Sequence, residues 1–135
     1  MKKIIVIMLI ISSIIMLPSC EKPQQEVLGL DQENSCFMGF EVENNFVYLE
    51  CWLYITNMRN KDLEFTISAD FTEDVELGLL KNPILYACDE LNNKQIFTIK
   101  AGAAENFKCT FVGEYAGVYQ RHDRMLPEDI TFHVN

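Results

Sequence analysis

Apolar and polar side chains alternate with a period of two along residues 63–71, and this pattern constrains the fold more than any other feature. Leu, Phe, Ile, Ala and Phe occupy every second position, and Glu, Thr, Ser and Asp fill the positions between them. Successive side chains of a strand point to opposite faces of a sheet. The alternation therefore predicts a strand with one face in a core and the other in solvent. The expected core residues are Leu63, Phe65, Ile67 and Phe71.

Two earlier stretches, residues 36–43 and 46–56, alternate in the same way. They are separated by Asn44 and Asn45, and asparagine tolerates the left-handed backbone that a tight hairpin turn requires. We therefore expect the two stretches to form a hairpin.

Shorter apolar stretches and turn signals fill the rest of the chain. Hydrophobic residues make up 49% of the sequence, which is enough for a globular core. About seven antiparallel strands in about 100 residues are typical of a sandwich of two sheets. We expect an all-β fold with no regular helix beyond one turn within residues 73–81. The later strands are expected at residues 84–88, 95–100, 106–113 and 130–134.

The first residues have the pattern of an export signal. Lys2 and Lys3 precede residues 4–17, which are apolar except for two serines. This run is shorter than the about 20 residues of a membrane-spanning helix, and it suits the apolar part of a signal peptide. It continues into Leu-Pro-Ser-Cys, which resembles the lipobox of bacterial lipoproteins. The alternative interpretation is an ordinary secretory signal that ends in cysteine.

The lipobox resemblance implies that Cys20 carries lipid and becomes the mature N-terminus. It divides the chain into a signal peptide (residues 1–19), a lipidated flexible tether (residues 20–35) and a folded domain (residues 36–135). The expected location is extracytoplasmic, anchored by lipid to the bacterial cell membrane or outer membrane. Two acyl chains suffice for stable anchoring.

Two segments resemble immunoglobulin-like domains of bacterial surface lipoproteins. The first is Leu-Tyr-Ile-Thr-Asn at residues 53–57, a polar turn, and Lys-Asp-Leu-Glu-Phe at residues 61–65. The second is Phe-Thr-Ile-Lys-Ala-Gly at residues 97–102, followed by the strand expected near residues 107–111. The resemblance implies an immunoglobulin-like sandwich, and it implies little about activity.

The second strand carries the most informative side chains. One of its faces is aliphatic or thiol at every position, so we expect that face in the core. The opposite face holds four aromatic residues and Glu50, whose burial without a partner would be unfavourable. An exposed aromatic surface of this size favours a contact with protein or glycan. The alternatives are that other segments cover it or that it is a patch for self-association. The four aromatic residues are Phe46, Tyr48, Trp52 and Tyr54.

Four cysteines remain after Cys20. An even number outside the cytoplasm permits two disulfides, but no close spacing is present, and we favour free thiols buried as small apolar groups. Alternation places three of them, Cys36, Cys51 and Cys109, on core faces and leaves Cys88 ambiguous. No CxxC spacing occurs, so the sequence predicts no metal site and no cofactor.

The remaining polar residues carry no catalytic signature. His122 lies in a charged segment, His133 lies in the last expected strand, and no GxSxG motif accompanies either. The acidic residues at positions 70, 73, 74 and 76 lack the spacing of a calcium loop, so we interpret them as a solvated turn. The formal charge of −9 makes a nucleic-acid partner unfavourable.

The sequence thus predicts a non-enzymatic lipoprotein of the cell envelope that binds protein or glycan. The alternative function is a protease inhibitor that presents the loop at residues 113–127. A small enzyme is the least favoured interpretation.

Overall fold

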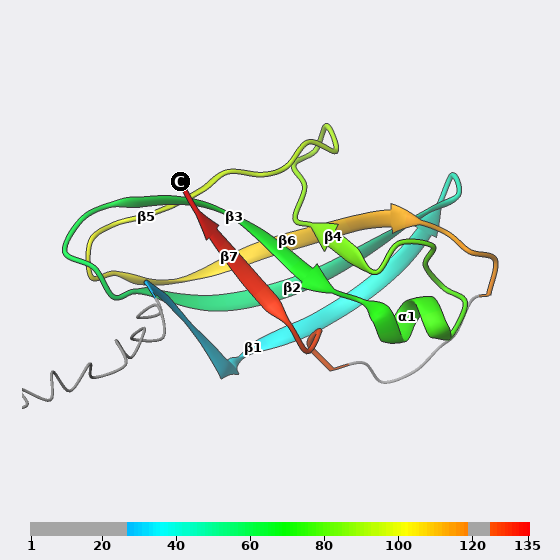
Figure 1. Cartoon of the computed structure of the whole chain (residues 1–135), viewed down its shortest axis with the longest axis horizontal. Coiled ribbons are helices and arrows are strands. Elements are labelled where there is room, and N and C mark those ends of the chain that lie inside the picture. Colours follow the sequence, from blue (N-terminus) through cyan, green and yellow to red (C-terminus); the bar gives the residue numbers. More distant parts are fainter. Residues whose placement is uncertain (1–26, 119–124) are drawn as a thin grey trace, which may run out of the picture.

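The computed structural model describes residues 27–118 and 125–135, which form two antiparallel sheets packed face to face (Figure 1). The predicted all-β sandwich of seven strands is confirmed. Its one helix in the described residues, α1 (Thr72–Glu76), has about one turn and lies between the third and fourth strands. It is too short to cross a membrane.

Sheet A has the strand order β1-β2-β6. Sheet B is built around β3, which pairs with β4 and β5 along one side and with β7 along the other. The strands of sheet A are β1 (Leu28–Glu43), β2 (Phe46–Asn57) and β6 (Ala104–Glu114). The strands of sheet B are β3 (Leu63–Asp70), β4 (Ile84–Tyr86), β5 (Phe97–Ile99) and β7 (Ile130–Val134).

The core lies between the sheets, where the predicted inner faces meet. The aliphatic and thiol face of β2 is completely buried. Asn44 and Asn45 have positive φ angles of 52° and 66° and form the predicted turn between β1 and β2. In sheet B the expected core residues Leu63, Phe65, Ile67 and Phe71 are all buried.

Phe65 is the centre of an aromatic cluster that joins the sheets. Its ring centroid lies 5.6 Å from that of Phe97, 5.9 Å from that of Phe107 and 5.9 Å from that of Phe132. Phe97 and Phe132 belong to strands beside β3, whereas Phe107 lies on β6 of the opposite sheet. The edge-to-face contact between Phe65 and Phe107 therefore links the two layers.

Strand β1 begins earlier than the sequence predicts. It starts at Leu28, which is buried in the core and pairs with Asn57 of β2. The prediction that residues 28–35 belong to a flexible tether is therefore wrong, because their backbone is part of sheet A. The predicted signal peptide, Cys20 and the first part of the tether lie outside the described residues.

Two irregularities in the β1–β2 register change the direction of the β1 side chains. The register shifts once between Asp31 and Cys36 and again between Phe37 and Gly39. Each added residue in a bulge reverses which face later side chains occupy. As a result Cys36 and Met38, which alternation placed in the core, are exposed, and Phe37 packs against the core instead. Cys36 lies opposite Trp52, which is also on the outer face of sheet A.

Side-chain hydrogen bonds hold the first irregularity in place. The Asp31 carboxylate accepts hydrogen bonds from the Glu33 and Asn34 backbone and from the Asn34 side chain. The Ser35 hydroxyl donates to the Asp31 carbonyl at 2.6 Å and accepts from the Tyr54 N–H at 2.9 Å. Ser35 therefore satisfies a β2 donor at a point where the strand-to-strand ladder is interrupted.

Backbone hydrogen bonds join the two sheets along one long side. The Cys88 N–H donates to the Thr110 carbonyl at 2.7 Å, and the Lys81 N–H donates to the Glu114 carbonyl at 3.1 Å. Both acceptors belong to β6, so residues 80–88 are hydrogen-bonded to sheet A. A Cβ atom at Gly113 of β6 would lie 2.8 Å from a Leu80 methyl carbon, which explains why glycine suits this close approach.

Candidate functional site

The aromatic face of β2 points out of the sandwich, as alternation predicts. Phe46 is 40% exposed, and Tyr48, Trp52 and Tyr54 are each partly exposed. Their neighbours along the strand, from Val47 to Ile55, are buried on the opposite face. We call these four residues the aromatic row.

Polar side chains flank the aromatic row on both neighbouring strands. On β1, directly opposite members of the row, lie Asp31, Glu41 and Glu43. On β6, the corresponding positions include Asn106, Lys108 and Glu114. Side chains opposite one another on antiparallel strands have Cβ atoms about 4.5–5.5 Å apart. The row is therefore a strip of aromatic surface between hydrogen-bonding groups, most of them acidic.

Glu50 lies in the middle of the row and is partly exposed. Its carboxylate oxygen lies 3.6 Å from the Lys108 Nζ, in an ion pair whose side chains are both well exposed. Such a solvent-exposed pair contributes only about 0–1 kcal/mol to stability. Glu50 and Lys108 therefore remain available to a ligand.

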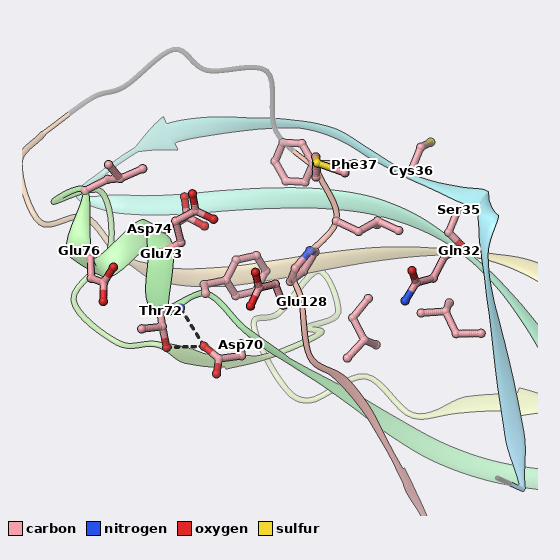
Figure 2. Close-up of a pocket in the computed structure, with 17 residues that line it drawn as sticks. Gln32, Ser35, Cys36, Phe37, Asp70, Thr72, Glu73, Asp74, Glu76 and Glu128 are labelled. Atoms are coloured by element: carbon pink, nitrogen blue, oxygen red, sulfur yellow. Dashed lines mark hydrogen bonds between the residues drawn. The ribbon is translucent and has the colours of Figure 1, made fainter.

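A second feature is a hollow between the β1 edge, α1 and the segment before β7 (Figure 2). Its volume is about 1220 Å³, and apolar side chains such as Phe71 and Leu126 form part of its lining. The predicted acidic turn lines it, joined by Glu128. Asp70 accepts hydrogen bonds from the Thr72 N–H and hydroxyl, and the Thr72 hydroxyl hydrogen bond lowers the pKa of Asp70 most. In the described residues no three His, Cys, Asp or Glu side chains are grouped closely enough to hold a metal ion.

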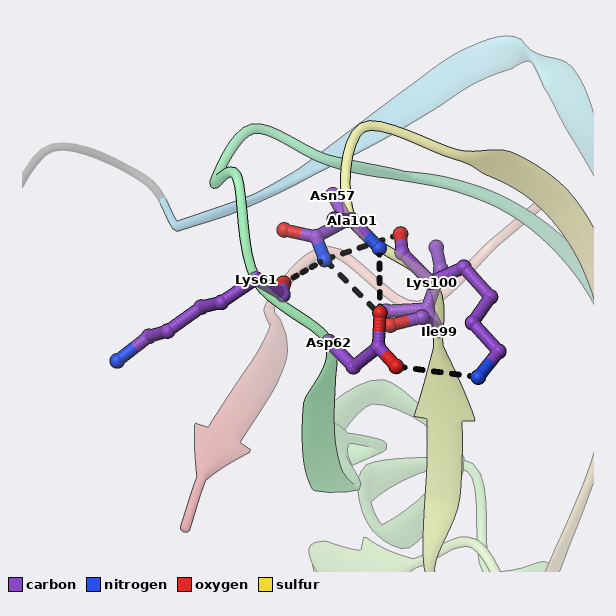
Figure 3. A network of polar contacts seen from close by, with 6 residues as sticks. All are labelled: Asn57, Lys61, Asp62, Ile99, Lys100 and Ala101. Atoms are coloured by element: carbon purple, nitrogen blue, oxygen red, sulfur yellow. Dashed lines mark hydrogen bonds and ion pairs between the residues drawn. The ribbon is translucent and has the colours of Figure 1, made fainter.

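The sequence missed a buried polar cluster at the end of β2 (Figure 3). Asn57 is only 1% exposed, although a polar turn follows it directly. Its Nδ2 donates to the carbonyls of Lys61 at 2.8 Å, Lys100 at 3.1 Å and Ile99 at 3.4 Å. Its Oδ1 accepts from the Arg59 N–H at 2.9 Å. Asn57 thus ties sheet A to the end of β5 in sheet B.

Asp62 lies next to this cluster and holds the turn that follows β5. It accepts hydrogen bonds from the Ala101 N–H at 2.9 Å and from the Lys100 ammonium at 3.1 Å. These bonds, led by the one from Ala101, lower the pKa of the Asp62 carboxyl. The polar groups of Asn57 and Asp62 form hydrogen bonds within the cluster, so we assign it a structural role.

The outer face of sheet B carries a different row of polar contacts. The Ser68 hydroxyl lies 2.7 Å from the His133 Nε2, and the His133 ring lies 5.4 Å from the Tyr86 ring. Lys94 Nζ lies 3.8 Å from the centroid of that Tyr86 ring. Ser68 is buried beneath these neighbours. The Ser68–His133 distance is that of a nucleophile and its base, but Ser68 is only 6% exposed, so a substrate has little access to its hydroxyl.

The loop predicted for protease inhibition lies partly outside the described residues. Within residues 113–118, the Ala116 and Val118 N–H groups donate to the carbonyls of Leu79 and Gly78. This part of the loop is therefore attached to the chain that follows α1. Residues 119–124, including His122, are not described.

The cysteines divide into two groups. All four cysteines of the described residues have free thiols. Cys51 and Cys109 are completely buried, as predicted, whereas Cys36 is exposed and Cys88 is partly buried.

Comparisons with protein-family models, with curated proteins and with solved structures gave no match to this chain. The aromatic row is the described surface whose chemistry best fits recognition of another molecule.

Proposed function

We propose that this chain is a lipid-anchored, non-enzymatic binding module of the bacterial cell envelope. Its aromatic row contacts a protein or glycan partner. One observation carries the proposal: four aromatic side chains lie on the solvent face of β2 while the opposite face of the same strand is fully buried.

The chemistry of the row suits recognition. Tyr and Trp provide large, rigid contact area together with a polar group, and they are enriched where partners bind tightly. The flanking carboxylates and Lys108 supply hydrogen bonds on either side of the rings. A partner rich in hydroxyl or amine donors complements this acidic, aromatic strip.

The proposed anchor rests on the sequence. Lys2 and Lys3, the apolar run and Leu-Pro-Ser-Cys resemble the signal of a bacterial lipoprotein. Segments 53–65 and 97–111 resemble immunoglobulin-like domains of surface lipoproteins. Both resemblances support an extracytoplasmic binding role, on the cell membrane or the outer membrane.

The test uses the full chain in detergent and the fluorescence of Trp52, which is the only tryptophan. Envelope polysaccharide and individually purified envelope proteins are titrated in separate arms, and saturable changes in emission identify the partner class. We expect Tyr48→Ala and Tyr54→Ala to weaken binding at least about tenfold, because rigid aromatic anchors dominate such contacts.

Tyr86→Ala is the matched control, since Tyr86 is a partly exposed aromatic residue on the outer face of the other sheet. It should bind like the parent chain. Equal weakening by all three substitutions, or no saturable response in either arm, contradicts the proposal. Thermal melts of each variant separate a loss of binding from a loss of fold.

A further inference from the structure

Two sulfur atoms lie side by side on the solvent face of β1. Cys36 Sγ and Met38 Sδ are 3.8 Å apart. Met38 is 54% exposed and Cys36 is also exposed with a free thiol. Cys36 lies between the two register shifts and Met38 lies within the second, and both side chains point out of the core.

Their chemistry is that of a site for a soft metal ion. Thiolate and thioether sulfurs are soft ligands that select Cu(I) over the hard divalent cations. Two metal–sulfur bonds of about 2.3 Å each can span up to about 4.6 Å, so one ion can reach both sulfurs across the observed 3.8 Å.

The neighbouring strand supplies further groups that favour a cation. Trp52 is the direct partner of Cys36 in the β1–β2 register and lies on the same outer face. The face of an indole ring attracts cations. Glu50, the partner of Gly39 directly after Met38, adds a carboxylate to the same outer face, where it also pairs with Lys108.

We propose that Cys36 and Met38 bind one Cu(I) ion beside the Trp52 indole. Binding replaces the Cys36 thiol proton, which passes to solvent, and forms a copper–thiolate bond and a copper–thioether bond without change in oxidation state. This metal site goes beyond the proposed partner-binding function and requires neither a protein nor a glycan.

The experiment titrates the full chain in detergent, without oxygen, with Cu(I) buffered by bicinchoninate, and separately with Ag(I) as a probe that does not change oxidation state. Trp52 is the only tryptophan and lies opposite Cys36, so its emission reports metal binding when no other ligand is present. We expect saturable quenching of its emission at one equivalent. Cys36→Ser should abolish the quenching, and Met38→Leu should weaken the affinity about tenfold or more.

Matched control variants remove one thiol and one thioether that lie outside the proposed site. Cys88→Ser and Met58→Leu change a less exposed thiol and an exposed thioether away from the pair, and they should respond like the parent chain. Alkylation of Cys36 in folded Cys88→Ser protein gives a second way to block the site without altering the fold. Quenching that persists after Cys36→Ser or alkylation, or its absence in the parent chain, overturns the proposal. The metal titrations contain no protein or glycan partner, so their failure is separable from failure of partner binding.

Discussion

Cys51 of β2 and Cys109 of β6 lie directly opposite each other in the sheet A register, and both are completely buried with free thiols. Burial, with a smaller contribution from a neighbouring thiol, raises the pKa of each from 9.0 to about 12. A thiol with so high a pKa is neutral and unreactive at neutral pH. The pair therefore acts as two small apolar groups of the core.

The first prediction concerns stability at alkaline pH. Because the two thiols titrate near 9 when unfolded and about 12 when folded, their contribution is complete below pH 9 and is lost as the pH rises toward 12. The free energy of unfolding should fall across this interval. Urea denaturation with a reductant at several pH values measures the decline.

Other groups also titrate in this interval, so the control is the double variant Cys51→Ala, Cys109→Ala. It should be less stable at neutral pH, because two side chains are truncated in the core. Its stability should depend less steeply on alkaline pH than that of the parent. Identical slopes would show that the buried thiols do not contribute.

The second prediction concerns Asn57. Asn57→Ala leaves the carbonyls of Lys61, Ile99 and Lys100 without this donor, and it should lower the free energy of unfolding by about 3 kcal/mol. Asn60→Ala, in the same turn but exposed, should change it by less than about 0.5 kcal/mol. Urea midpoints compare the two variants, and similar losses would count against a special role for Asn57.

The third prediction tests the direction of the β3 side chains. Phe65→Ala removes the ring that contacts Phe97, Phe107 and Phe132, and it should lower the free energy of unfolding by about 3–5 kcal/mol. Thr66→Ala on the outer face should lower it by less than about 1 kcal/mol. Chemical denaturation of both variants measures the difference. Near-equal effects would be incompatible with the observed register.

The fourth prediction concerns the irregularity in β1. Ser35→Ala removes the acceptor of the Tyr54 N–H, so the Tyr54 amide hydrogen should exchange with solvent faster. The loss of stability should be about 1–3 kcal/mol, as for other buried donors left without a partner. Thr56→Ala, on β2 like Tyr54, is the control and should leave the exchange rate of the Tyr54 amide hydrogen unchanged. Unchanged exchange at Tyr54 in Ser35→Ala would mean that another acceptor replaces the hydroxyl.

The fifth prediction concerns the anchor. Protein purified from its native membrane should begin at Cys20 and carry the mass of attached acyl chains. Cys20→Ala should release the protein from the membrane fraction, since a single remaining signal segment is too short for a stable span. Mass spectrometry of the N-terminus is decisive, and an unmodified Cys20 would refute lipidation.

The sequence predicts most of the sandwich because its strands obey one local rule. Burial alternates along most of β2 and along β3 as far as Ile67, so the faces of Leu49, Phe65 and their neighbours follow directly from spacing. The aromatic row was predictable for the same reason, and the exposures of Tyr48 and Trp52 agree with it.

The sequence prediction fails where β1 contains inserted residues and where a hydrogen-bond partner comes from far along the chain. The Asp, Asn and Ser residues that close the β1 irregularity are also typical of loops, so residues 28–35 resemble a tether. The exposed Cys36–Met38 pair depends on the second irregularity, between Phe37 and Gly39, and could not be predicted from alternation. The acceptors of Asn57 on Ile99 and Lys100 lie more than 40 residues away in the sequence, which no local pattern reveals.

The two long sides of the sandwich differ in how strongly the sheets are joined. On one side, backbone hydrogen bonds connect β6 to residues 80–88. On the other side, β1 and β7 are the edge strands of their sheets in the described residues. Transient separation of the layers should therefore begin between β1 and β7. Unpaired strand edges attract other extended chains, so this opening side is where edge-to-edge aggregation of the domain would start.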